Sequence, residues 1–187
     1  MPRIIAGLWK GRRLDGPATI RPTQDKVRAA CFNILGEAVI GARVLDLYAG
    51  TGALGLEALS RGAAQVTFVE SEAACVQAIR RNIAAMSPEA GHRCAVLAGR
   101  ATQLLARLAT QGERFDLVFS DPPYDRSTGK KCLIHLEASA IINPCGWAVL
   151  EHAAQDEVPG TVGSLTRSLQ RRYGDTALSF YVMRATP

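Results

Sequence analysis

The residues with the clearest chemical potential lie in a glycine-rich stretch that follows an apolar run. Residues 44–47 are mostly apolar and typical of a buried strand, and Gly50-x-Gly52-x-x-Gly55 comes directly after them. Leucines at helical spacing then indicate the start of a helix. Glycine lets a backbone turn sharply and approach a ligand closely, and the N–H groups of the helix point toward the same place. The stretch therefore predicts a binding site for a small polar molecule.

Two acidic residues beside the glycines bear on which molecule binds. The glycine spacing fits a dinucleotide fingerprint, and Glu70 follows a second apolar run, 66–69, where a ribose-binding acid is expected. A nicotinamide oxidoreductase is therefore one interpretation. Asp46, inside the first strand, favours a cationic ligand instead, because a carboxylate repels a pyrophosphate.

A second chemical motif, Asp121-Pro122-Pro123-Tyr124, follows the apolar run 117–119. A carboxylate and a proline-fixed carbonyl can accept the two N–H bonds of an amino group, which directs the nitrogen lone pair toward an electrophile. Tyr124 can stack on a planar base. The structural alternative is a proline-stiffened turn that ends a strand.

Taken together, these motifs resemble a known class of enzymes. Residues 46–52, Glu70 and the Asp-Pro-Pro-Tyr motif are similar to those of Rossmann-like, S-adenosylmethionine-dependent methyltransferases that act on exocyclic amino nitrogens. Arg-Pro-Thr-Gln-Asp-Lys-Val-Arg at 21–28 and Phe-Asn-Ile-Leu at 32–35 narrow the resemblance to the RsmD family, the bacterial guanine-N2 methyltransferases of small-subunit ribosomal RNA. It extends over nearly the whole chain.

The resemblance implies a cofactor, a substrate and two groups of site residues. The cofactor would be S-adenosyl-L-methionine, with S-adenosyl-L-homocysteine as product, and the substrate a guanine of 16S rRNA, naked or within the small ribosomal subunit. Glu70 would bind the ribose hydroxyls, although it could instead cap the following helix. The implied cofactor-binding residues are Asp46, Tyr48, Ala49, Gly50, Thr51, Gly52, Glu70, Ser71 and Ala101. The implied catalytic residues are Asp121, Pro122, Pro123 and Tyr124.

One position departs from the family pattern. Many methyltransferases place a carboxylate or amide after the third strand to accept a hydrogen bond from the adenine amino group, but this chain has Arg100 there. Arginine has no acceptor. Either a backbone carbonyl or Gln103 takes that role, or Arg100 faces solvent or RNA.

Alternating apolar and amphipathic segments indicate the elements that position these residues. We expect strands at 43–48, 65–70, 94–98, 115–120 and 146–151, helices at 23–35, 53–61, 72–86, 101–110 and 130–141, and tail strands at about 166–173 and 177–184. Continuous apolar strands and right-handed crossovers predict a parallel sheet that brings Gly50, Glu70, Arg100 and Asp121 to one edge. The fold class is α/β. By resemblance it is a Rossmann-like class I methyltransferase fold, with a seven-stranded, mostly parallel sheet, an antiparallel C-terminal strand pair and helices on both faces.

Length and charge indicate one domain with a basic N-terminus. The 187 residues suit a single domain, 1–187, with 1–20 as a basic β-hairpin extension. Residues 1–28 hold seven basic and two acidic residues, which equals the whole net charge of +5. Such a segment fits a polyanion, although a solvated surface is the plain alternative. The expected RNA-binding residues are Arg3, Lys10, Arg12, Arg13, Arg21, Thr23, Lys26 and Arg28. Residues 125–131 are either a loop that closes over RNA or ordinary surface.

The remaining composition argues against other classes. Five widely spaced cysteines form no C-x-x-C pair, so we expect neither a metal nor a disulfide, and no apolar run is long enough for a membrane span. A cytoplasmic monomer is expected. The alternatives left open are a methyltransferase of DNA amino groups or of a protein glutamine, a non-catalytic RNA-binding module, and the oxidoreductase.

Overall fold

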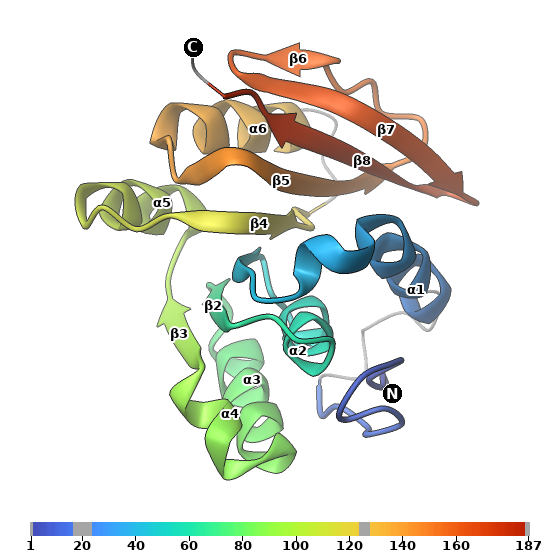
Figure 1. Ribbon diagram of the computed structural model, residues 1–187, viewed down its shortest axis with the longest axis vertical. Coiled ribbons are helices and arrows are strands. Elements are labelled where there is room, and N and C mark those ends of the chain that lie inside the picture. The colour runs from blue at the N-terminus through green and yellow to red at the C-terminus, as the bar shows by residue number, and fades with distance from the viewer. Residues whose placement is uncertain (1, 17–23, 124–127, 186–187) are drawn as a thin grey trace. The chain divides into compact units, whose positions relative to one another are not determined.

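The computed structural model describes residues 2–16, 24–123 and 128–185 of the chain (Figure 1). These residues form two compact units, Met1–Ala101 and Thr102–Pro187, and each is treated by itself below. No helix in the described ranges is long and apolar enough to cross a membrane.

The first unit is built on three parallel strands in the order β3-β2-β1. Each crossover contains a helix, and α2 and α3 pack on the strands (Figure 1). Because the strands are parallel, their carboxyl ends meet at one edge of this sheet. The elements are α1 (Gln24–Leu35), η1 (Gly36–Val39), β1 (Arg43–Leu47), α2 (Ala53–Ser60), β2 (Gln65–Glu70), α3 (Ala73–Met86), α4 (Pro88–His92) and β3 (Cys94–Ala98).

Helix α3 shows how the sequence specifies these elements. Val76, Ile79, Ile83 and Met86 recur at helical spacing and all are buried. The helix ends before Ser87, whose backbone is extended. The Ser87 side chain caps α4 by accepting the Ala90 N–H at 3.3 Å. An apolar stripe and a polar cap thus fix both the face and the end of α3.

Gly55 allows α2 to lie unusually close to β2. A Cβ on this residue would lie 2.7 Å from Val66 Cγ1 and would also overlap the Phe68 ring. This is the packing role expected of the third glycine in the fingerprint.

Gly55→Ala is therefore expected to destabilise the protein by about 1–3 kcal/mol, the usual cost of overpacking a core. Gly91→Ala is the matched control, because a Cβ there meets nothing within 4 Å, and the change is expected to be neutral or stabilising by about 0.4–1 kcal/mol. Urea unfolding measures both variants. Equal stabilities would show that α2 does not need the close approach.

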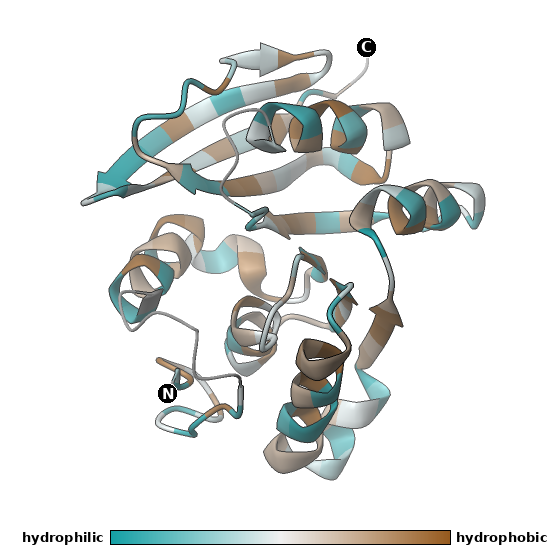
Figure 2. Ribbon diagram, turned by 180° about the vertical axis from the view of Figure 1, so that it is seen from behind, coloured by the Kyte–Doolittle hydropathy of each residue, from teal (hydrophilic) through white to brown (hydrophobic). Residues whose placement is uncertain are grey.

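Within the described ranges, the second unit has five strands in the order β4-β5-β8-β7-β6. Strands β4 and β5 are parallel, whereas the pairs β5–β8, β8–β7 and β7–β6 are antiparallel. Helix α6 packs on β5, and Figure 2 shows how hydrophobic and hydrophilic residues are distributed over these elements. The elements are α5 (Ala101–Thr110), β4 (Phe115–Ser120), α6 (Thr128–Ser139), β5 (Ile142–Ala153), β6 (Thr161–Val162), β7 (Leu165–Tyr173) and β8 (Thr176–Met183).

The expected α/β class and the antiparallel C-terminal strand pair are confirmed, with two differences in the strands. Helix α6 also begins at Thr128 and not at residue 130, so residues 128–131 are helical and not part of a loop. All seven expected strands are present, and an eighth, β6, was missed because two residues carry no detectable pattern. Strand β5 begins at Ile142 and not at residue 146, because Ile142 already pairs with Phe115 before a shift in register. The extra residues bulge out at Pro144 and Cys145, both exposed.

Candidate functional site

The loop after β1 has the sharp backbone that the glycine pattern predicts. Tyr48, Gly50 and Gly52 adopt positive φ angles of 59°, 56° and 78°. The Gly52 N–H donates to the Ala49 carbonyl at 2.7 Å, and the Ala49 N–H donates to Val69 of β2 at 3.1 Å. A non-glycine residue at positive φ is uncommon and is often found at functional sites. The loop is therefore tightly held at the carboxyl edge of the three-stranded sheet.

Glu70 joins this loop to the start of α3. Its Oε2 accepts the Gly50 N–H at 2.8 Å, and its Oε1 accepts the N–H groups of Ser71 and Glu72 at 2.7 and 2.8 Å. These two N–H groups belong to residues that precede α3, whose N-cap is Glu72, so Glu70 holds the segment that leads into the helix and does not cap the helix itself. Each carboxylate oxygen has two lone pairs, so Oε2 keeps one for a further donor such as a ligand hydroxyl. The bonds that Glu70 makes to Gly50, Ser71 and Glu72 therefore leave room for the ribose-binding role.

Asp46 is buried under the glycine loop, with 1% of its surface exposed. Its Oδ2 accepts the Gly55 N–H at 2.9 Å, which ties β1 to the first turn of α2. Burial raises the pKa of Asp46 to about 8; the Gly55 N–H opposes this shift and the negative charge of Glu70 adds to it. The carboxyl group thus supports the loop from below, where a cation bound nearby would favour its ionised form.

The raised pKa predicts that stability falls as pH rises. The ordinary pKa of an aspartate is 3.8, so between about pH 4 and pH 8 Asp46 in the folded state holds a proton that the unfolded state has lost. The free energy of unfolding should therefore decrease by up to about 1.4 kcal/mol per pH unit from this group. Asp46→Asn should remove that slope. Unfolding at pH 5, 6 and 7 tests this, and a variant with the wild-type slope would contradict it.

The other expected cofactor residues differ in their access to solvent. Thr51 is buried, Ser71 is exposed, and Ala101 is the buried first residue of α5. Arg100 and Gln103 are both exposed, and of these two side chains only Gln103 contains a hydrogen-bond acceptor. The exposure of Arg100 agrees with the alternative in which this side chain faces solvent or RNA.

Asn82 was not anticipated from the sequence. It is a buried residue of α3, with 2% of its surface exposed, and its Nδ2 donates to the Thr51 carbonyl of the glycine loop at 3.0 Å. Its position on the buried stripe of α3, three residues after Ile79, is the signal that could have revealed it, because a buried amide needs partners.

In the second unit, the Asp-Pro-Pro motif follows the end of β4. Ser120, the last strand residue, is buried and forms a 2.9 Å hydrogen bond with Cys132 Sγ of α6. Asp121 is half-buried, Pro122 is buried and Pro123 is exposed. Tyr124 and residues 125–127 lie outside the described residues. The contact with α6 thus anchors the strand at the point where the motif begins.

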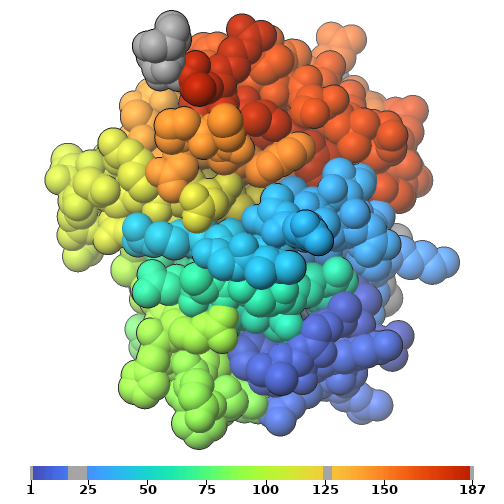
Figure 3. Space-filling model, viewed as in Figure 1, coloured from blue at the N-terminus to red at the C-terminus, as the bar shows by residue number. Residues whose placement is uncertain are grey.

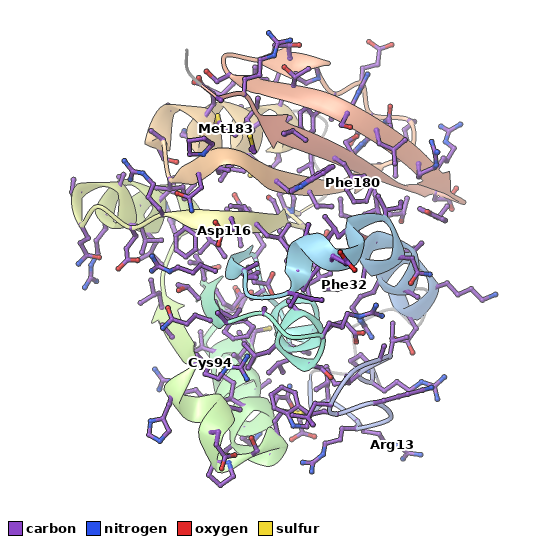
Figure 4. The ribbon with its side chains drawn as sticks, in the orientation of Figure 1. Arg13, Phe32, Cys94, Asp116, Phe180 and Met183 are labelled. Atoms are coloured by element: carbon purple, nitrogen blue, oxygen red, sulfur yellow. The ribbon has the colours of Figure 1, made fainter. Side chains whose placement is uncertain are left out.

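Residues 2–14 of the basic N-terminal segment fold back on themselves, as a small hairpin does, and contact α2 and α3, whereas residues 17–20 of the expected extension lie outside the described residues. Arg3 and Arg13 form one antiparallel bridge, flanked by a bond from the Ile4 N–H to the Arg12 carbonyl at 2.9 Å. Figure 3 shows this segment, in dark blue, against the teal and green atoms of residues 50–90. The exposed members of the expected RNA-binding set are Arg3, Lys10, Arg12, Arg13 (labelled in Figure 4) and Lys26.

Arg28, one of the expected RNA-binding residues, is buried and does not face solvent. Only 3% of its side chain is exposed, because its Nη2 donates to the Arg3 carbonyl at 2.6 Å and to Asp25 Oδ1 at 2.8 Å. Its Nε lies 4.0 Å from the buried Glu57. Arg28 is thus committed to internal partners. Arg21 and Thr23 lie outside the described residues.

Glu57 of α2 is a second residue that the sequence did not single out. It is fully buried, and its carboxylate accepts the N–H groups of Ile5 at 2.6 Å and Ala6 at 3.0 Å, together with Arg61 Nε at 2.7 Å. Arg61 in turn lies over the Phe32 ring, 4.9 Å from its centroid. The N-terminal segment is therefore attached to the helix that starts at the glycine loop.

A metal centre was not expected, and within the described ranges no group of three or more His, Cys, Asp or Glu residues is arranged to hold an ion.

Comparison with known proteins identifies the family of this chain. Residues 2–182 match the family model described as Conserved hypothetical protein 95. The putative rRNA methyltransferase YlbH of Bacillus subtilis is 35% identical over 184 residues, which cover 97% of this chain and 99% of that protein. Ribosomal RNA small subunit methyltransferase D of Escherichia coli K12 is 33% identical over 185 residues, 98% of this chain and 90% of that protein.

The structure of this chain is similar to a solved structure. The putative methyltransferase yhhF from Escherichia coli matches with a TM-score of 0.88 and 34% identity, covering 99% of both chains. The α/β architecture described above is thus that of a class I methyltransferase. The chain belongs to the family described as Conserved hypothetical protein 95, the RsmD family of methyltransferases.

Proposed function

We propose that this chain transfers the methyl group of S-adenosyl-L-methionine to the exocyclic N2 of a guanine in 16S ribosomal RNA. The observation that carries the proposal is the match to the Escherichia coli small-subunit methyltransferase D over 98% of the chain, a span that includes the glycine loop, Glu70 and the Asp-Pro-Pro-Tyr motif. The dinucleotide alternative shares the glycines and the acid but leaves the second motif without a role.

The carboxyl edge of the first unit supports cofactor binding. Glu70 lies at the end of β2 with an oxygen in contact with the Gly50 N–H, so a ribose placed over the loop would meet an acceptor for its hydroxyls. A positively charged ligand above the loop would favour the ionised form of Asp46, so ligand binding and ionisation of Asp46 would support each other. Tyr48, Ala49, Thr51, Gly52, Ser71 and Ala101 complete the proposed cofactor-binding set.

The motif after β4 supplies what an amino group needs in order to react. The lone pair of a guanine amino group is delocalised into the purine ring, so hydrogen-bond acceptors must orient the nitrogen. Asp121 and the Pro122 carbonyl would accept its two N–H bonds, with Pro123 fixing the turn and Tyr124 stacking on the base. The bound donor would supply a methyl group on a positively charged sulfur, which becomes a neutral thioether when that group is transferred to the nitrogen. Asp121 then takes the proton that the nitrogen must lose.

The exposed cations of the N-terminal segment support an RNA partner. Lys10, Arg13 and Lys26 are exposed and carry the sequence-independent attraction that phosphates exert on basic residues. A guanine amino group is reachable only when the base is unpaired or flipped out. The RNA would therefore be bound by its backbone and read at one extruded base.

Labelled methyl transfer tests this function directly. The purified protein is incubated with labelled S-adenosylmethionine and three acceptors: unmethylated small ribosomal subunits, the same RNA stripped of protein, and duplex DNA. Label in either ribosomal acceptor and none in DNA is the expected result. Label in DNA or in a protein would show that the proposed RNA substrate is wrong. If NADP raises the melting temperature and S-adenosylhomocysteine does not, the proposed cofactor is wrong and the oxidoreductase interpretation is favoured.

A further inference from the structure

The Asn82 amide touches two segments that the proposed function assigns to different ligands. Its Nδ2 donates to the carbonyl of Thr51 in the glycine loop at 3.0 Å and to the carbonyl of Asp15 in the N-terminal segment at 2.9 Å. Its Oδ1 accepts the Asp15 N–H at 2.7 Å. Asn82 is 2% exposed, and its bond to the Thr51 carbonyl is buried, whereas its two bonds to Asp15 are partly buried. One buried amide plane thus links the proposed cofactor loop to the segment that carries the exposed cations.

Other contacts hold the N-terminal segment without reaching the glycine loop. Arg81, next to Asn82 in α3, forms an exposed ion pair with Asp15 Oδ2 at 3.2 Å. Arg12 donates to the carbonyls of Ala85 and Met86, the latter at 2.8 Å, at the end of the same helix. These bonds fasten the segment to α3. The Asn82 bonds differ because they also constrain Thr51.

The geometry of the amide converts movement at one segment into strain at the other. Its two N–H bonds and its carbonyl share one plane on a buried side chain, so a shift of Asp15 relative to α3 either lengthens a bond to Asp15 or turns the amide away from the Thr51 carbonyl. An RNA that fixes the N-terminal segment therefore also fixes Thr51, and a cofactor that orders the loop stabilises the position of Asp15. Such coupling is reciprocal by thermodynamic linkage.

We propose that Asn82 is a positioning residue that couples RNA binding by the N-terminal segment to cofactor binding at the glycine loop. This inference rests on the proposed function, because it needs both ligands. It gives a definite role to a buried polar residue outside the proposed cofactor and RNA contacts. Through Asn82, bound RNA prepares the loop for the methyl donor.

The test compares the affinity for S-adenosylhomocysteine with and without small-subunit 16S rRNA. Titration calorimetry of the wild-type protein should show a dissociation constant about fivefold or more lower in saturating RNA, within the usual range of allosteric coupling. In Asn82→Ala the ratio of the dissociation constant without RNA to that with RNA should fall to one, while each ligand still binds. Arg81→Ala is the matched control, since it removes the Asp15 ion pair and keeps the Thr51 bond, and its ratio should equal that of the wild type.

A second readout needs no variant. Hydrogen exchange of the Gly52 amide in the wild-type protein should slow when RNA alone is added, and it decides the question if Asn82→Ala does not fold. A wild-type ratio of one, an unchanged ratio in Asn82→Ala, or unaltered Gly52 exchange would overturn the coupling. Wild-type methylation of the RNA would continue in that case, whereas failure of the proposed function would abolish it.

Discussion

Asp121→Ala is expected to lower kcat for methyl transfer by roughly 10²- to 10⁴-fold, the range for loss of a charged acceptor that acts in the transition state. The side chain would accept an N–H bond from the amine and later its proton, and alanine can do neither. The cofactor contacts proposed for Glu70 and the glycine loop are untouched. The dissociation constant of S-adenosylhomocysteine should therefore stay at the wild-type value.

Single-turnover transfer to saturating RNA measures the chemical step, and calorimetry measures the cofactor. Asp116→Asn is the matched control, because Asp116 (labelled in Figure 4) lies at the other end of β4, where its Oδ1 accepts a hydrogen bond from Asn143 at 2.7 Å that an amide oxygen can replace. It should transfer methyl groups at the wild-type rate. A rate within threefold of wild type for Asp121→Ala would remove Asp121 from the chemistry and revive the structural interpretation of the proline turn.

Glu57→Ala should destabilise the protein by about 3–5 kcal/mol, as expected when one partner of a buried ion pair is removed. The carboxylate is fully buried and binds the N–H groups of Ile5 and Ala6 as well as Arg61. Alanine leaves all of these donors without their acceptor, and unpaired buried donors are costly. Glu57→Gln keeps one acceptor oxygen, and its free energy of unfolding should lie between those of the wild type and Glu57→Ala.

Urea unfolding gives the free energies, and hydrogen exchange at Ile5 and Ala6 reports on the segment itself. Glu37→Ala, which removes an exposed carboxylate in η1, is the control and should stay within about 0.5 kcal/mol of wild type. If Glu57→Ala unfolds like the control, the buried network does not secure the N-terminal segment.

The sequence predicted those parts of the fold that arise from local periodicity. Strands and helices with long apolar patterns, such as β2 and α3, lie at or within one residue of their expected bounds. The short elements η1, α4 and β6 were missed because two to five residues give no measurable period. The early start of β5 depends on pairing with Phe115, a partner that no local pattern contains.

The candidate site was predictable where a motif implies a backbone shape and less so where burial decides. The positive φ angles at Gly50 and Gly52 follow from the glycine spacing. The burial of Arg28 was not foreseen, because helical spacing does not show that Asp25 and the Arg3 carbonyl surround it. Net charge located the basic segment correctly, but it cannot separate cations that face solvent from one that holds the segment in place.

The identity of the methylated nucleoside decides whether the proposed reaction is correct. RNA from small subunits treated with the protein and S-adenosylmethionine is digested to nucleosides and analysed by mass spectrometry against standards. We expect N2-methylguanosine, absent when Asp121→Ala replaces the wild-type protein. Methylation of another base or of another guanine atom would contradict the role given to the Asp-Pro-Pro-Tyr motif. An RNA without new methyl groups would contradict the proposed substrate.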